Sequence, residues 1–112
     1  MKIYHNPRCR KSRETLALIK EKGIEPEIVL YLNTPPNKKE LQTIVEQLGI
    51  QPSQLIRKSE KVYKENYKGR KLSEEEWLAA MIQYPKLIER PIVLKNGRAI
   101  LGRPPENVLE LL

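Results

Sequence analysis

The sequence predicts an α/β fold in which a small mixed sheet is built from a βαβ unit and a ββα unit, with a helical insertion between them. Apolar runs typical of strands lie near both ends of the chain, around residues 2–5, 27–32, 92–95 and 98–101. A helical pattern separates the first two runs, and an Asn-Gly turn joins the last two. The middle of the chain, about residues 37–88, carries helix and loop patterns.

The N-terminal part predicts the βαβ unit. Residues 2–5 are β-prone, and Asn6-Pro7 ends this strand because proline disfavours helix at the preceding residue and has no N–H to donate. Apolar positions then recur among charges over about residues 10–22, and Gly23 suits the left-handed position beyond a helix end. Residues 27–32 are mostly apolar, which is typical of a strand buried on both faces. A right-handed crossover joins the two strands.

The central part predicts two well-marked helices. Asn37 and Glu40 have the spacing of a capping box, and apolar residues follow at i, i+3, i+4 and i+7 until Gly49. Ser73 and Glu76 repeat the capping-box spacing ahead of a second apolar stripe. Between these helices, a short helical turn is expected at residues 52–56, and the polar segment 61–71 is interpreted as a loop or a frayed helix.

The C-terminal part predicts a hairpin and a last helix. Asn96-Gly97 between two apolar runs supplies the two positive-φ residues that a type I′ turn requires. A helix is then expected from Pro104-Pro105-Glu106 onward, with Val108, Leu109, Leu111 and Leu112 on its apolar side. The order of these elements describes a thioredoxin-like sheet, and residues 1–112 are expected to form one domain with an insertion at about 37–88.

Composition excludes several classes of protein. The 112 residues suit one soluble domain, and no window approaches the ~20 apolar residues of a membrane span. No apolar signal region precedes the first strand, so we expect a cytoplasmic monomer that binds no membrane. The net charge of +7 favours acidic partners, but zinc-finger spacing and RNA-binding aromatic motifs are absent, so no specific nucleic-acid binding is expected.

The stretch from His5 to Arg13 holds the only cysteine, the only histidine and four cations. It falls where a strand gives way to a helix, and the N–H groups of a helix N-terminus stabilise a thiolate or a bound oxyanion. A lone cysteine is often a small buried hydrophobe. Here the neighbouring Arg8, Arg10 and Lys11 are too costly to bury, which favours a reactive Cys9 at the surface.

Two other residues in this stretch are candidates for supporting the thiol. His5 either supports the thiolate as a cation, transfers a proton, or only ends the strand. Ser12 stands at Cys-x-x-Ser spacing, where its hydroxyl either donates to the thiolate or caps the helix. The chain has no second cysteine, so an internal disulfide is excluded and the electrons for turnover must come from outside.

Three arginines lie next to apolar segments at element boundaries: Arg57, Arg90 and Arg103. Arginine is always charged, and its planar fork of donors matches a tetrahedral oxyanion better than lysine does. Solvated surface charge is the alternative interpretation. The Arg90-Pro91 bond is a candidate for a cis peptide in a tight turn.

Five motifs together carry a family resemblance that covers nearly the whole chain. They are Ile3-Tyr4-His5-Asn6-Pro7-x-Cys9, Tyr31-Leu32-x-x-Pro35-Pro36, Leu55-Ile56-Arg57-Lys58, Glu89-Arg90-Pro91-Ile92-Val93 and Gly102-Arg103-Pro104. In this order and spacing they resemble the glutaredoxin-dependent arsenate reductases. The resemblance implies a thioredoxin-like fold with a helical insertion and an arsenate reductase that has no bound cofactor or metal.

Matched residue by residue, the resemblance implies that Cys9 attacks the arsenic of arsenate to give a covalent adduct. Arg57, Arg90 and Arg103 would hold the oxyanion, while His5 favours the thiolate and Ser12 supplies a nearby hydroxyl. Glutathione, as co-substrate, would attack the adduct, and glutaredoxin would resolve the mixed disulfide.

The sequence departs from the better-known members of this family after the cysteine. Those members have small residues there, whereas this chain has Arg10 and Lys11, which either strengthen anion binding or obstruct glutathione. Two alternatives remain at this point: an Spx-type regulator that binds RNA polymerase, although such sensors typically carry Cys-x-x-Cys, or a thiol-dependent reductase or transferase that acts on another oxyanion.

Overall fold

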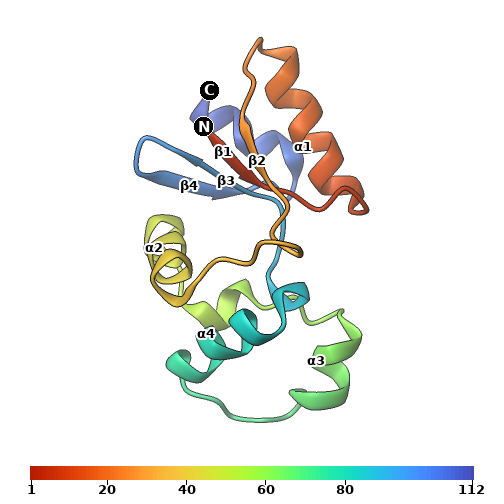
Figure 1. The fold of residues 1–112 in the computed structure, drawn as a ribbon, viewed down its shortest axis with the longest axis vertical. Coiled ribbons are helices and arrows are strands. Elements are labelled where there is room, and N and C mark those ends of the chain that lie inside the picture. The colour runs from red at the N-terminus through yellow and green to blue at the C-terminus, as the bar shows by residue number, and fades with distance from the viewer. The chain divides into compact units, whose positions relative to one another are not determined.

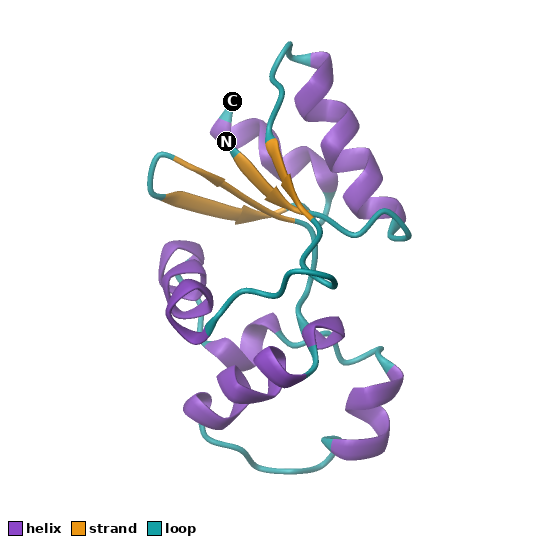
Figure 2. Cartoon of the chain, in the orientation of Figure 1, coloured by secondary structure: helices purple, strands orange, loops and turns teal.

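The computed structural model describes residues 1–112, which form two compact units. The sheet unit comprises Met1–Thr34 and Arg90–Leu112, and the helical unit comprises Pro35–Glu89. The helical unit covers nearly the same residues as the predicted insertion, while the organisation of the chain as one domain stays a prediction. Figure 2 distinguishes helices, strands and loops by colour. The elements in chain order are β1 (Lys2–Tyr4), α1 (Arg10–Glu21), β2 (Glu27–Val29), α2 (Lys38–Leu48), η1 (Pro52–Leu55), α3 (Lys61–Asn66), α4 (Glu74–Gln83), η2 (Pro85–Leu87), β3 (Ile92–Lys95), β4 (Arg98–Leu101) and η3 (Pro105–Leu111).

The sheet unit is built on four strands in the order β2-β1-β3-β4. β1 runs parallel to β2, with Ile3 opposite Ile28, and antiparallel to β3, with Ile3 opposite Val93. β3 and β4 form an antiparallel hairpin, and α1 crosses over between β1 and β2 (Figure 1). This confirms the predicted βαβ and ββα units and their thioredoxin-like arrangement.

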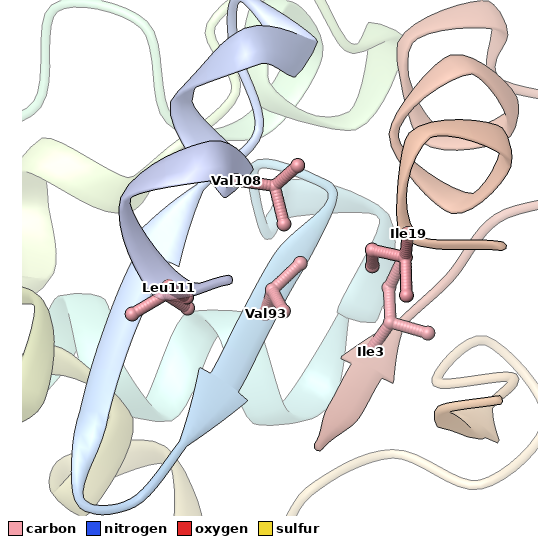
Figure 3. Packing of buried hydrophobic residues seen from close by; sticks show 5 residues of the cluster. All are labelled: Ile3, Ile19, Val93, Val108 and Leu111. Atoms are coloured by element: carbon pink, nitrogen blue, oxygen red, sulfur yellow. The ribbon is translucent and has the colours of Figure 1, made fainter. Parts of the chain in front are cut away.

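One face of this sheet carries the core of the unit. Ile3 and Val93 are paired across β1 and β3, so their side chains point to the same face. Ile19 from α1 and Val108 and Leu111 from η3 pack against them (Figure 3). α1 and η3 therefore cover the same face, and burial of α1 there fixes its N-terminus next to the end of β1.

The local signals in the sequence are confirmed. Asn96 and Gly97 have φ values of 52° and 76° in the β3–β4 turn. In the helical unit, both capping boxes are formed: Asn37 with Glu40 begins α2, and Ser73 with Glu76 begins α4. The short helical turn is η1, and the segment 61–71 begins as the six-residue helix α3.

The prediction that residues 27–32 form a strand buried on both faces is wrong. β2 has three residues, and Glu27 and Ile28 are exposed. The reason is its place at the edge of the sheet, where it pairs with β1 alone. An apolar run does not by itself distinguish a central strand from an edge strand.

The last helix also differs from the expectation. η3 is a 3₁₀ helix, and the period of three residues per turn places Pro105, Val108 and Leu111 on its buried side. Leu109 and Leu112, which were expected on the apolar side, are 43% and 36% exposed. None of the helices in either unit has both the length and the apolar composition that a bilayer crossing needs.

Candidate active site

Cys9 stands at the N-cap of α1. Its backbone is extended, with φ −94° and ψ 122°, and its carbonyl accepts the Arg13 N–H at 3.0 Å. The Cys9 N–H donates to the Asn6 carbonyl at 2.9 Å, which closes a tight turn from the end of β1. The side chain is half-buried. The sulfur therefore lies where the unpaired N–H groups of the helix begin.

The turn before Cys9 is held by two residues that were not predicted as site residues. The Asn6 side chain accepts the Arg8 N–H at 3.0 Å, and the Asn6 N–H donates to Ser12 Oγ at 3.0 Å. Arg13 reaches back from α1 and donates to the Pro7 carbonyl at 2.9 Å. Asparagine before proline is itself a turn signal, so Asn6 was detectable from the sequence. The contact of Arg13 was not.

The local environment lowers the pKa of the Cys9 thiol below its usual value. Burial raises this pKa, but hydrogen bonding from the Ser12 N–H and from the Arg90 side chain, the Arg90 charge and the Lys11 N–H lower it by more. Each of these groups stabilises the thiolate, which is the nucleophilic form of cysteine. The sequence predicted that the helix end lowers this pKa, and a guanidinium from a distant part of the chain lowers it as well.

Arg90 and Arg103 enter the site from the two open ends of the β3–β4 hairpin. Because Ile92 pairs with Leu101, the segments that carry both arginines leave the sheet side by side. Arg103 Nη1 lies 4.0 Å from Cys9 Sγ and donates to the Arg90 carbonyl at 3.1 Å. The Arg90 side chain is buried. The Arg90-Pro91 bond is cis, as the sequence suggested, and so is the bond from Arg103 to Pro104.

His5 and Ser12 form a buried pair behind Cys9. His5 Nδ1 lies 2.6 Å from Ser12 Oγ, and both side chains are buried. Burial, followed by the charges of Arg13 and Lys20, lowers the pKa of His5, so the ring is neutral at neutral pH. In the neutral ring with its proton on Nε2, Nδ1 accepts from the serine hydroxyl. Ser12 therefore serves Cys9 through its backbone N–H, while its hydroxyl joins His5 to Asn6.

Arg57 belongs to the helical unit. Its Nη1 donates to Glu89 Oε1 at 3.0 Å, and its Nε lies 3.3 Å from Glu60 Oε1. Its backbone N–H donates to the Leu87 carbonyl at 2.7 Å. Within its own unit, Arg57 is therefore a partly buried side chain paired with two carboxylates. The structure groups Cys9, His5, Ser12, Arg90 and Arg103 in the sheet unit, and the role of Arg57 in an oxyanion site stays a prediction.

Two features of the sheet unit adjoin Cys9: an exposed Arg10 and a cavity beside the preceding turn. Arg10 Nε bonds to Glu14 Oε1 at 2.8 Å along the exposed side of α1, where the Arg10 side chain is 84% exposed. A cavity of about 340 Å³ borders the turn before Cys9, and its lining combines apolar, amide and cationic groups: His5, Asn6, Pro7, Arg8, Leu30, Leu32 and Asn33. No group of three or more metal-ligating side chains is present.

Taken together, the site presents a thiol of lowered pKa beside one buried and one half-buried guanidinium at a helix N-terminus. A tetrahedral oxyanion bound there would meet the arginines through its oxygens and the sulfur through its central atom. The arrangement suits nucleophilic attack by sulfur on a bound oxyanion.

Known proteins of the same architecture place the chain in a family. It is 54% identical to the uncharacterized protein YfgD of Escherichia coli K12, over 100% of this chain and 96% of that protein. It is 49% identical to an arsenate reductase of Haemophilus influenzae, over 98% of this chain and 97% of that protein. The structure of an arsenate reductase from Vibrio cholerae matches with a TM-score of 0.93 and 51% identity, over 100% of this chain and 98% of that one. The model of the ArsC family matches residues 4–111, and the chain belongs to the ArsC family.

Proposed function

We propose that this protein is an arsenate reductase in which Cys9 is the nucleophile. The observation that carries the proposal is the lowered pKa of Cys9 beside the guanidinium groups of Arg90 and Arg103. Relatives at 40–49% identity that bear the name arsenate reductase support the choice of arsenate as the oxyanion.

In the first step, the Cys9 thiolate attacks the arsenic of arsenate. A sulfur–arsenic bond forms, one arsenic–oxygen bond breaks, and the oxygen leaves as hydroxide or, after protonation, as water. Arg90 and Arg103 balance the charge of the remaining oxygens, and the N–H groups of Lys11 and Ser12 face the sulfur and its adduct. Arginine suits this task because its fork can bind two oxygens of the same anion.

In the second step, an outside thiol must supply the reducing electrons, because the chain holds a single cysteine. The glutathione thiolate attacks the Cys9 sulfur of the adduct, a sulfur–sulfur bond forms, and the sulfur–arsenic bond breaks with its electron pair left on arsenic. The two electrons released as the two sulfurs are oxidised to this mixed disulfide reduce arsenic from the +5 to the +3 state, and arsenite leaves. Glutaredoxin then exchanges thiols with the mixed disulfide and restores Cys9.

Two features support access of glutathione to Cys9. The cavity of about 340 Å³ beside the turn is lined by Arg8, which can pair with a carboxylate of glutathione, and by apolar side chains, which can contact the rest of this small peptide. Arg10, which the sequence left either as an aid to anion binding or as an obstacle to glutathione, is engaged by Glu14 on the solvent side of α1. We further expect the protein to act as a monomer in the cytoplasm, where glutathione keeps thiols reduced.

The coupled assay tests this proposal. Purified protein is incubated with arsenate, glutathione and glutaredoxin, and arsenite is measured as it forms. We expect turnover with all three components and none after Cys9→Ser. Asn37→Ala removes the cap of α2 in the helical unit and serves as a control that keeps the thiol. Absence of arsenite with the unaltered protein would overturn the assignment of arsenate.

A further inference from the structure

Thr15 is a fully buried polar residue on α1 that the proposed reaction does not use. Its hydroxyl donates to the Lys11 carbonyl at 2.8 Å, one turn earlier in the same helix. The shorter of the two hydrogen bonds of this hydroxyl therefore lies within α1. The side chain contacts the rest of the unit mainly through van der Waals packing of its surface. This surface packs against Gly102, whose carbonyl also accepts a longer hydrogen bond from Thr15 Oγ1, at 3.4 Å.

Gly102 has no room for a side chain. A Cβ on this residue would lie 2.6 Å from Thr15 Oγ1, 3.1 Å from Thr15 Cγ2 and 2.8 Å from Pro91 Cγ. The other four glycines show the opposite situation, with a positive φ and open space where a Cβ would lie. Gly102 is thus required for close packing, whereas the others serve backbone conformation.

The three residues in contact each belong to a segment that carries part of the site. Thr15 lies on the helix that begins at Cys9, Gly102 precedes Arg103, and Pro91 follows Arg90. The Gly102 N–H donates to the Pro91 carbonyl at 2.9 Å, which ties the two arginine segments to each other. Thr15 is the point at which this pair meets α1.

We infer that Thr15 and Gly102 are positioning residues, whose contact with Pro91 sets how closely Arg90 and Arg103 approach Cys9. This assignment rests on the proposed function for the meaning of the site, but its geometry does not depend on the substrate. A shift of about 1 Å in a positioned group can lower a rate by about 100-fold. A methyl group at Gly102 demands a shift of several tenths of an ångström or more from Thr15 or Pro91.

The test measures three quantities on each variant. The first is the apparent pKa of Cys9, from the pH dependence of its alkylation by iodoacetamide, which needs no arsenate. The second is KM and kcat for arsenate in the coupled assay. The third is the midpoint of urea unfolding. The control is Gly97→Ala, which strains the turn at the far end of the same hairpin and leaves Gly102 in place.

For Gly102→Ala, we expect the pKa of Cys9 to rise toward that of a free thiol and KM for arsenate to increase by about tenfold or more. In the double variant Thr15→Ala/Gly102→Ala, the new methyl occupies space that the threonine atoms have left, while its close approach to Pro91 Cγ remains, so the pKa shift and the KM increase should be reversed in part. Gly97→Ala should lower the urea midpoint without changing either quantity.

A second pair of variants avoids overpacking. Thr15→Val keeps the shape of the side chain, and Thr15→Ala removes it while favouring the helix. We expect Thr15→Val to behave like the unaltered protein and Thr15→Ala to raise KM by about threefold or more, with kcat less affected. Equal KM and pKa values for the unaltered protein, Thr15→Val and Thr15→Ala would overturn the inference. A double variant with the same KM and the same pKa of Cys9 as Gly102→Ala would also overturn it. If no protein reduces arsenate, the proposed function fails, while the alkylation pKa still decides the role of Thr15 and Gly102.

Discussion

Replacement of Ser12 by alanine should destabilise the protein far more than removal of one hydroxyl usually does. Ser12 Oγ contacts His5 Nδ1 at 2.6 Å and accepts the Asn6 N–H at 3.0 Å. Ser12 is fully buried, and His5 and Asn6 are 6% and 7% exposed. Loss of the oxygen leaves two buried groups without this partner, at about 1–3 kcal/mol each.

We therefore expect Ser12→Ala to lower the free energy of unfolding by about 2–4 kcal/mol, measured by urea titration at neutral pH. Thr43→Ala is the matched control, because its exposed hydroxyl bonds only the Lys39 carbonyl of its own helix, and it should change the stability by less than about 0.5 kcal/mol. In a His5→Leu background, Ser12→Ala should lower the free energy of unfolding by about 1 kcal/mol less than it does in the unaltered protein, because no imidazole is present to lose its hydrogen-bond partner. A loss below about 1 kcal/mol for Ser12→Ala alone would refute the buried network.

Three further outcomes follow from the geometry of the site. Alkylation of Cys9 should show an apparent pKa below ~8.5, and Arg90→Gln should raise it; a midpoint at or above the free value would contradict the thiolate environment. Because the pKa of His5 is lowered in the folded state, the contribution of this residue to stability should be complete above a pH of ~6.5 and should decline as the pH falls below that value. His5→Gln should reduce this pH dependence when urea midpoints are compared across pH. Arg90→Lys should raise KM for arsenate by about tenfold, since one charge-assisted hydrogen bond of the fork is lost; an unchanged KM would remove Arg90 from the anion site.

The parts of the fold that the sequence predicted well depend on short-range chemistry. Both capping boxes involve residues three positions apart, and the Asn96-Gly97 turn needs only two positive φ values. The helix start at Cys9 was predictable for the same reason, because strand, proline and helix follow one another within a few residues. Such features survive in the folded protein because they do not depend on distant packing.

The features that escaped prediction depend on distant neighbours. The edge position of β2 results from the pairing of β1 with β3, which no pattern within residues 27–32 records. Thr15 has the appearance of an ordinary helix residue, and only its contact with Gly102, at a separation of 87 positions, reveals a packing role. The Ser12 hydroxyl was assigned to the cysteine or to a cap because its partner His5 becomes its neighbour only when β1 and α1 fold together.

The separation of 94 positions between Cys9 and Arg103 has a consequence for the nascent chain. Arg90 and Arg103 are synthesised 81 and 94 positions after Cys9. Until the C-terminal hairpin joins β1, the sulfur lacks both guanidinium groups and keeps more of the protonated thiol character of a free cysteine, which reacts slowly with oxidants. The separation of the activating cations from Cys9 along the chain thus delays full activation of the thiol until the β3–β4 hairpin has folded against β1.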